Sequence, residues 1–104
     1  MYVIISTTID TKEAAYQIAN ILVHKQLAAC VQIELVNSVY TWKGKILDTE
    51  EYRLQIKTRE NLYDDVAVQI RMVHTYETPE IIATPMSHIS ENYGTWMESV
   101  LREQ

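Results

Sequence analysis

The chain is short, moderately apolar and acidic, and these properties exclude several classes of protein. Its 104 residues correspond to one domain, residues 1–104, whose 47% hydrophobic and 22% charged side chains are typical of a globular protein and not of a disordered one. A net charge of −5 with scattered Lys and Arg residues argues against a nucleic-acid partner, which requires clustered cations.

The start of the chain predicts a strand followed by a helix. Residues 2–8 form a short apolar run that ends in threonines, which indicates a buried strand. Asp10 and Glu13 resemble an N-cap and its acidic partner, and apolar residues follow at helical spacing as far as Leu22. Cations lie near the predicted end of this helix, where they suit the helix dipole.

The middle of the chain predicts a long antiparallel hairpin. Apolar and polar side chains alternate within residues 27–42 and again over residues 52–57. Between them, Lys43-Gly44-Lys45 predicts a turn in which Gly takes a positive φ. Two strands of about 14 residues each would span roughly 45 Å, which is longer than one small domain covers. The expected tip of the hairpin carries Tyr40 and Trp42.

The second half of the chain predicts a helix, a short strand and a final helix. Asn61 is the expected cap of a helix whose apolar stripe ends at Val73. Residues 81–85 form the strand, and Ser90 caps a last helix with a dense apolar repeat up to Leu101. The order β-α-β-β-α-β-α predicts an α+β fold, the ferredoxin-like split βαβ sandwich, with an added C-terminal helix.

Helices cover only one face of such a sheet. The long hairpin strands, their alternating apolar residues and the aromatic tip predict pairing with another chain, because an uncovered long edge would template aggregation. We expect a closed cyclic oligomer in which the hairpins extend one another's sheets and the uncovered faces meet inside.

The sequence also predicts a cytoplasmic location without a membrane partner. No apolar run approaches the about 20 residues that cross a bilayer. The first residues lack the basic and apolar regions of a signal peptide. A single cysteine excludes an internal disulfide framework.

The segment from His74 to Ile82 is a candidate functional loop. Pro79 stiffens it and forces the preceding helix to end. An imidazole, a phenol and two carboxylates are thereby held close together, and loops of this kind are common places for sites. The alternative is a helix stop followed by an acidic surface turn, which the loop alone favours.

A small cleft of mixed charge is a second hypothesis. Lys57 ends the third predicted strand and Glu80 begins the fourth, so we expect both at the same end of the sheet. With Trp42, His74 and Tyr76 they would line a pocket in which Lys57 attracts an anion or small molecule. A salt bridge that pins the strand ends is the alternative, and it is slightly favoured.

Metal binding has one candidate donor in the predicted hairpin. Cys30 is a soft ligand that suits a thiophilic metal such as copper. Because no CxxC or HxxxH motif accompanies it, a buried structural role in the strand is favoured. His24, His74 and His88 are widely separated, so any metal site must be assembled in space or across subunits.

Catalysis receives little support, and we expect a protein that is not an enzyme. Ser6 and Ser38 have neither a local His partner nor the glycines of a nucleophile elbow. Gly44 and Gly94 are the only glycines, so the chain has no glycine-rich phosphate loop.

Four segments together resemble the CutA family of divalent-cation tolerance proteins. They are residues 27–31 (LAACV), 38–46 (SVYTWKGKI), 50–58 (EEYRLQIKT) and 74–82 (HTYETPEII). With Pro85, Tyr93 and Trp96, the resemblance covers essentially the whole chain. The chain departs from the family at Ile89, where Gly is usual, and at Gly94, where Leu is usual. Ser6 replaces a second Cys of some members, which lowers the expectation of a thiolate-rich copper site.

The resemblance implies a ferredoxin-like subunit in a tight homotrimer, similar in architecture to PII signalling proteins. It also implies a role in tolerance of divalent cations, copper especially, with Cys30 and His74 matching proposed copper ligands. The residues that it implies near an intersubunit cleft are Tyr40, Trp42, Lys57, Tyr76 and Glu80. An open alternative is a PII-like module that binds a small anionic metabolite between subunits and signals to a protein partner.

Overall fold

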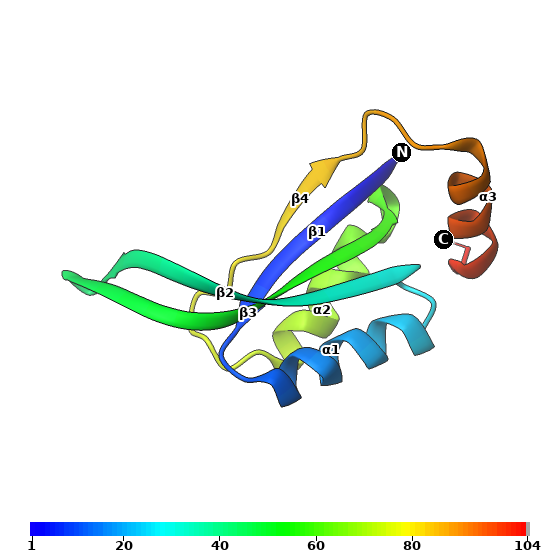
Figure 1. The fold of residues 1–104 in the computed structure, drawn as a ribbon. Coiled ribbons are helices and arrows are strands. Elements are labelled where there is room, and N and C mark those ends of the chain that lie inside the picture. Colours follow the sequence, from blue (N-terminus) through cyan, green and yellow to red (C-terminus); the bar gives the residue numbers. More distant parts are fainter. Residues whose placement is uncertain (104) are drawn as a thin grey trace.

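The computed structural model describes residues 1–103, which form a mixed α+β fold (Figure 1). Its elements are β1 (Tyr2–Ile9), α1 (Lys12–His24), β2 (Cys30–Trp42), β3 (Lys45–Arg59), the 3-10 helix η1 (Glu60–Leu62), α2 (Tyr63–Val73), β4 (Ile82–Pro85) and α3 (Glu91–Val100). The strands form one antiparallel sheet in the order β2-β3-β1-β4. This is the predicted ferredoxin-like split βαβ order with an added helix. No helix in residues 1–103 is long and apolar enough to cross a membrane.

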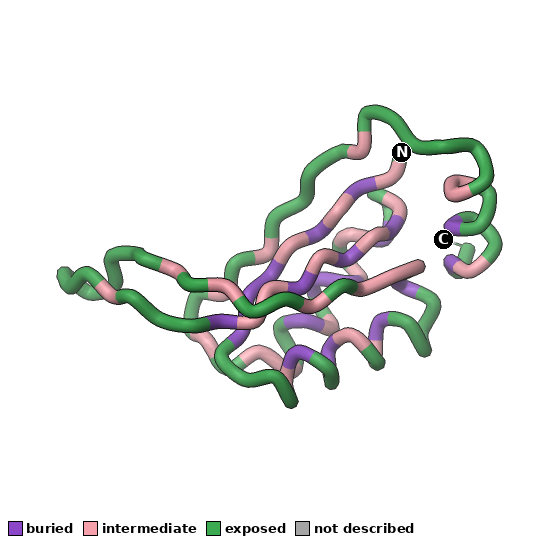
Figure 2. The backbone as a smooth tube through the Cα atoms, viewed as in Figure 1, coloured by how far each residue is buried: buried purple, intermediate pink, exposed green. Residues whose placement is uncertain are grey.

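The hydrophobic core lies between the sheet and the pair α1 and α2 (Figure 2). Ile5 of β1 pairs directly with Ile56 of β3, and both side chains are fully buried. Side chains alternate across a strand, so every second residue of each central strand points toward the helices. The helices contribute the apolar stripes that their sequence spacing predicts. These helical core residues are Ala15, Ile18, Leu22, Val66 and Ile70.

Two of the predicted helix caps are wrong. Thr11, and not Asp10, caps α1: its Oγ1 accepts a hydrogen bond from the Ala14 N–H at 3.1 Å. Asp10 follows directly on the end of β1, so the helix begins one residue later than predicted. Asn61 lies inside η1 because the chain enters α2 through a tight 3-10 turn. Ser90 is the N-cap of α3 as predicted, although its side chain makes no capping hydrogen bond.

The β2–β3 hairpin projects beyond the helices, as its predicted length requires. The two strands pair along their whole length, and the domain extends 45 Å along its longest axis. The turn residues Lys43 and Gly44 have φ of 50° and 79°, so the positive φ predicted for Gly44 is confirmed. The distal half has no helix beside it (Figure 1), and its Val39 and Ile46 side chains are 69% and 79% exposed.

The sheet face opposite α1 and α2 is mostly polar, although Ile82 of β4, which pairs with Ser6, is an exposed apolar residue on it. Ser6 of β1 donates a hydrogen bond to Gln55 of β3 at 2.6 Å. On the neighbouring strands, Arg53 and Glu34 form an ion pair at 2.7 Å. The alternating apolar residues of the hairpin's proximal half point toward the helices instead, where Leu54 and Ile56 are fully buried. This uncovered face is therefore suited to contact with water or with other polar groups.

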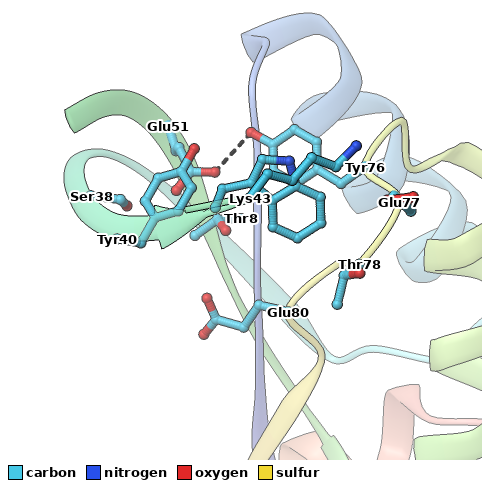
Figure 3. Close-up of a pocket in the computed structure, with 10 residues that line it drawn as sticks. Thr8, Ser38, Tyr40, Lys43, Glu51, Tyr76, Glu77, Thr78 and Glu80 are labelled. Carbon is cyan, nitrogen blue, oxygen red and sulfur yellow. Dashed lines mark hydrogen bonds between the residues drawn. The ribbon is translucent and has the colours of Figure 1, made fainter. Parts of the chain in front are cut away.

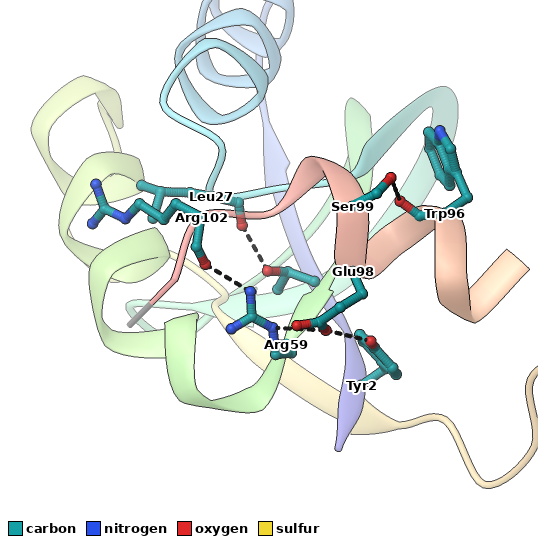
Figure 4. A network of polar contacts seen from close by, with 8 residues as sticks. Tyr2, Leu27, Arg59, Trp96, Glu98, Ser99 and Arg102 are labelled. Carbon is teal, nitrogen blue, oxygen red and sulfur yellow. Dashed lines mark hydrogen bonds and ion pairs between the residues drawn. The ribbon is translucent and has the colours of Figure 1, made fainter.

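α3 closes one end of the sheet through a polar network (Figure 4). The Tyr2 hydroxyl donates a hydrogen bond to Glu98 at 2.6 Å, and Arg59 forms an ion pair with the same carboxylate at 3.4 Å. The hydrogen bond to Glu98 raises the pKa of Tyr2 above its usual value. Met97, on the same helix, is fully buried in the core. The C-terminal helix is thus part of the domain and not an appendage.

The hydrogen bond between Thr58 and the Leu27 carbonyl provides a test of this fold. Thr58 is fully buried and donates to that carbonyl oxygen at 2.6 Å. A Thr58→Val variant keeps the shape of the side chain but removes the donor, so the free energy of unfolding should fall by about 1–3 kcal/mol. Guanidinium denaturation at fixed protein concentration measures this change. Thr41→Val, at an exposed position of β2, is the control. Equal losses of unfolding free energy in Thr58→Val and Thr41→Val would contradict the stabilising role of this hydrogen bond.

Candidate functional site

A pocket of about 620 Å³ lies where the distal hairpin meets the loop between α2 and β4 (Figure 3). Residues from β1, β2, β3, the hairpin turn and the loop converge on it, so no single segment of sequence defines it. Its lining residues are Thr8, Ser38, Tyr40, Trp42, Lys43, Glu51, Tyr76, Glu77, Thr78 and Glu80. Four of these, Tyr40, Trp42, Tyr76 and Glu80, are among the predicted cleft residues.

His74 fastens the loop to the sheet. Its Nε2 lies 2.7 Å from the carbonyl oxygen of Thr8, and its Nδ1 accepts a hydrogen bond from the Tyr76 N–H at 3.2 Å. Because a carbonyl oxygen only accepts and a backbone N–H only donates, these two contacts fit the tautomer that carries its proton on Nε2. The His74 and Tyr76 rings also pack edge to face, with centroids 4.7 Å apart. Both ring nitrogens are occupied, so this arrangement leaves His74 no free nitrogen for a metal.

Tyr76 in turn reaches a buried carboxylate on the hairpin. Its hydroxyl donates a hydrogen bond to Glu51 at 2.7 Å, and Glu51 is only 6% exposed. Burial raises the pKa of Tyr76 well above its usual value, and the bond to Glu51 raises it further. Among the described residues no ion pair involves Glu51. The Tyr76 hydroxyl is therefore the hydrogen-bond donor to the buried carboxylate of Glu51.

The charge of the pocket is negative. Glu51, Glu77 and Glu80 line it, and Lys43 is the basic residue in the lining. The Lys43 Nζ lies 5.7 Å from the centroid of the Trp42 ring, within the range of a cation–π contact. The pocket thus combines aromatic faces with an excess of carboxylates, a combination that attracts cations and repels anions.

Lys57 and Glu80 do not come together within one chain. Lys57 lies opposite Ile4 on β1, whereas Glu80 lines the pocket with Thr8, four residues further along that strand. That offset is about 13 Å at about 3.3 Å per residue. β3 and β4 both run antiparallel to β1, so they are parallel to each other. The end of β3 and the start of β4 therefore lie at opposite ends of the sheet, and the predicted approach is wrong within one chain.

The two predicted copper donors are separated in the same way. Cys30 pairs with Lys57 at one end of the sheet, whereas His74 binds the Thr8 carbonyl near the other end. Residues 1–103 contain no cluster of three or more His, Cys, Asp or Glu side chains that would hold a metal ion. Cys30 and His74 therefore do not fit a copper site built within a single chain.

Glu51 is the main site residue that the sequence did not reveal. It stands in the run Asp48-Thr49-Glu50-Glu51, which is typical of a solvated strand. Its position two residues before Arg53 places both on the same face of the strand. It also falls within residues 50–58, one of the segments that resemble the CutA family, but neither signal indicates a buried carboxylate. Its burial depends on Tyr76 folding over it from a different part of the chain.

Comparison with known proteins matches almost the whole chain to one family. Residues 3–100 match the model described as CutA1 divalent ion tolerance protein. The probable divalent-cation tolerance protein cutA homolog of Encephalitozoon cuniculi is 38% identical over 95 residues, which are 91% of this chain and 83% of that protein. The divalent-cation tolerance protein CutA of Thermus thermophilus is 32% identical over 90% of this chain and 92% of its own length. The chain spans only 56% and 58% of the chloroplastic CutA proteins of Arabidopsis thaliana and Oryza sativa.

Solved structures of similar proteins share the fold. The periplasmic divalent cation tolerance protein CutA from Archaeoglobus fulgidus superimposes with a TM-score of 0.95 at 32% identity, covering 98% of this chain and all of that one. CutA1 from Oryza sativa gives a TM-score of 0.94 at 36% identity, covering 99% of this chain and 95% of that one. At this similarity the comparison supports the family as well as the fold.

The hydrogen bond from Tyr76 to Glu51 makes a prediction about stability and pH. Tyr76→Phe leaves the buried carboxylate without its donor, so the free energy of unfolding at pH 8 should fall by about 1–3 kcal/mol. The raised pKa means that the folded protein keeps the phenol proton where the unfolded chain loses it, near the usual tyrosine pKa of about 10. The stabilisation is therefore present at lower pH and declines above that value.

Chemical denaturation at pH 8 and again above pH 10 measures this effect. The difference in free energy of unfolding between the wild-type protein and Tyr76→Phe should be smaller at the higher pH. Tyr16→Phe, at a half-exposed position of α1, is the control and should change stability little at either pH. A difference for Tyr76→Phe that stays constant or widens above pH 10 would refute the assigned role of the hydrogen bond.

Proposed function

The chain belongs to the CutA1 divalent ion tolerance protein family, and on that premise we propose that it is a non-enzymatic homotrimer that binds divalent cations. Copper is the expected cation, and divalent-cation tolerance is the expected role. The observation that carries the proposal is the uncovered distal half of the β2–β3 hairpin. The absence of an enzymatic role rests on the family's description, which refers to tolerance of an ion and to no reaction.

The hairpin supports assembly because it exposes apolar side chains and unpaired backbone groups, which folded monomers normally cover. Its distal half presents the apolar side chains of Val39 and Ile46, which are 69% and 79% exposed. β2 and β4 are also the outer strands of the sheet, so each has one row of backbone groups without a partner strand in the chain. Pairing between copies would cover the apolar residues and satisfy those groups.

Assembly also provides a way to bring Cys30 and His74, the separated copper donors, close together. Cys30 is a free thiol with intermediate exposure, and a thiolate with an imidazole is a suitable donor set for copper. Because Cys30 and His74 lie near opposite ends of one sheet, a site that contains both must take them from different copies. His74 would have to release the Thr8 carbonyl or the Tyr76 N–H to bind. Cys30 is therefore the more available donor.

The alternative of a small anionic metabolite has less support. Lys57, the cation expected to attract it, lies over the ring of Tyr93 with its Nζ 5.4 Å from the centroid. It does not line the pocket, where carboxylates outnumber the single lysine. Within one chain, the carboxylates of Glu51, Glu77 and Glu80 would therefore repel an anion from this pocket.

The proposed homotrimer predicts the mass of the protein in solution. Analytical ultracentrifugation at micromolar concentration should give three times the chain mass of 12.1 kDa. A double Val39→Lys, Ile46→Lys variant should shift the protein toward smaller species, because charges would replace the apolar contact. A monomer in the wild-type protein would contradict the proposal.

A matched double variant separates assembly from a general effect of added charge. Val23 and Val68 lie on the outer sides of α1 and α2 and are 45% and 50% exposed. Val23→Lys with Val68→Lys adds the same charge away from the hairpin and should leave the sedimentation unchanged. Equal dissociation of both doubles would remove the hairpin from the proposed interface.

Copper binding tests the donor assignment separately. We expect Cys30→Ser to weaken Cu²⁺ binding by about tenfold or more, as the loss of a charged soft ligand implies. His74→Ala should weaken it less, because the wild-type imidazole must first give up a hydrogen bond. Isothermal titration calorimetry measures both, with His88→Ala, at an exposed position, as the control. Unchanged affinity in both variants would remove these residues from the site without affecting the trimer.

A further inference from the structure

We propose that α3 and the two residues after it, Leu101 and Arg102, form a strap that opens as one unit while the sheet, α1 and α2 stay folded. Arg59 of β3 is the clasp of this strap, because its guanidinium group contacts both the helix and the segment that follows it (Figure 4). The contacts that carry the proposal lie within one chain. It therefore rests neither on the proposed trimer nor on its copper donors.

The sequence of α3 makes a weak helix. α3 has 10 residues, fewer than the about 12–15 at which an isolated helix is marginally stable in water. Gly94 lies in its interior, where glycine is less favourable than alanine. Ser90 gives the first turn no side-chain hydrogen bond, and Glu98 places a negative charge at the negative end of the helix dipole. Docking, and not helix propensity, therefore keeps α3 folded.

The apolar part of that docking is small. Of residues 91–100 only Met97 is buried, and Leu101 directly after the helix is 6% exposed. The core helices α1 and α2 each bury three side chains. Because apolar burial is the main favourable term in folding, α3 should open at a lower free energy than α1 or α2.

Polar contacts supply the rest of the docking. The Arg59 side chain is only 14% exposed, and its Nε lies 3.4 Å from the Glu98 carboxylate. Its Nη2 donates a hydrogen bond to the Arg102 carbonyl at 2.6 Å, and the Tyr2 hydroxyl donates to Glu98 at 2.6 Å. Burying a cation costs desolvation free energy that pairing offsets only in part. Opening returns Arg59 to water, so the clasp fixes the position of α3 without preventing its release.

Opening would change the end of the sheet that holds Cys30. Tyr2, Lys57 and Arg59 alternate with buried residues, so their side chains point to the face opposite α1 and α2. At this end α3 covers that face: the Lys57 Nζ lies 3.5 Å from the Tyr93 hydroxyl and 5.4 Å from the centroid of its ring. Lys57 is the cross-strand partner of Cys30. The strap thus determines whether Lys57, next to the thiol, is covered or open to solvent.

Hydrogen exchange of the assembled protein, followed by mass spectrometry, tests the strap. The hydrogen-bonded amides of α3, from Gly94 onward, should be protected at least about tenfold less than those of α1 and α2, and to a similar degree along the helix. Because the assembled protein is measured, a neighbouring copy that held α3 in place would also slow its exchange. Equal protection of α3 and α2 would overturn the proposal.

Substitutions at the clasp test its role. Glu98→Gln removes the charge that pairs with Arg59 and should speed exchange in α3 by a few-fold, with α1 and α2 unchanged. Arg59→Lys should speed it further, because a single ammonium group lacks the fork that contacts Glu98 and the Arg102 carbonyl together. Glu13→Gln makes the same change of charge at an exposed position of α1 and should leave α3 unchanged. Equally faster exchange in all three helices would show general destabilisation and would refute the clasp.

Gly94→Ala provides a prediction of the opposite sign. The added Cβ would lie 3.7 Å and 3.8 Å from two side-chain carbons of Ile89, which is an ordinary contact distance. Helix propensity therefore rises without a steric cost, and exchange in α3 should slow by about fivefold while α1 and α2 stay unchanged. Because this change favours the folded helix, the test does not depend on a variant that fails to fold. Unchanged or faster exchange in α3 would contradict the proposed opening.

Discussion

The β2–β3 hairpin extends further than the helices that pack on its sheet, and the main features of this protein depend on that mismatch. The proximal half of the hairpin is stabilised by the core, where Leu54 and Ile56 are fully buried. The distal half has only its own cross-strand pairs and leaves Val39 and Ile46 largely exposed. A two-stranded ribbon without a covering layer is marginally stable in water. The distal half of the hairpin is therefore a surface that contact with other groups would stabilise.

The loop after α2 provides part of that contact from within the chain. His74 holds the loop against β1 through the Thr8 carbonyl, and Tyr76 then reaches Glu51 on β3. The imidazole is thereby used for structure, with one nitrogen donating and the other accepting. This connection turns a flat strand surface into a walled pocket. It also explains why the loop contains an imidazole and a phenol.

The two ends of the sheet are chemically different. One end contains Cys30 and Lys57, with Lys57 covered by Tyr93 of α3. The other end contains the acidic and aromatic pocket that includes Trp42 and Glu51. A single chain thus has a soft thiol at one end and an acidic, aromatic pocket at the other. Only contact between copies would bring the thiol of one chain near the imidazole of another.

The sequence by itself determined the order of the elements, the length of the hairpin and its turn at Gly44. These features depend on local periodicity and on backbone preferences, which a sequence displays directly. The separation of Lys57 from Glu80 and the burial of Glu51 were decided only by the tertiary structure. Both depend on strand direction and register across the whole sheet, and on a side chain that arrives from a loop 25 residues away in sequence. Local patterns do not encode which strand ends become neighbours, because that depends on all the pairings at once.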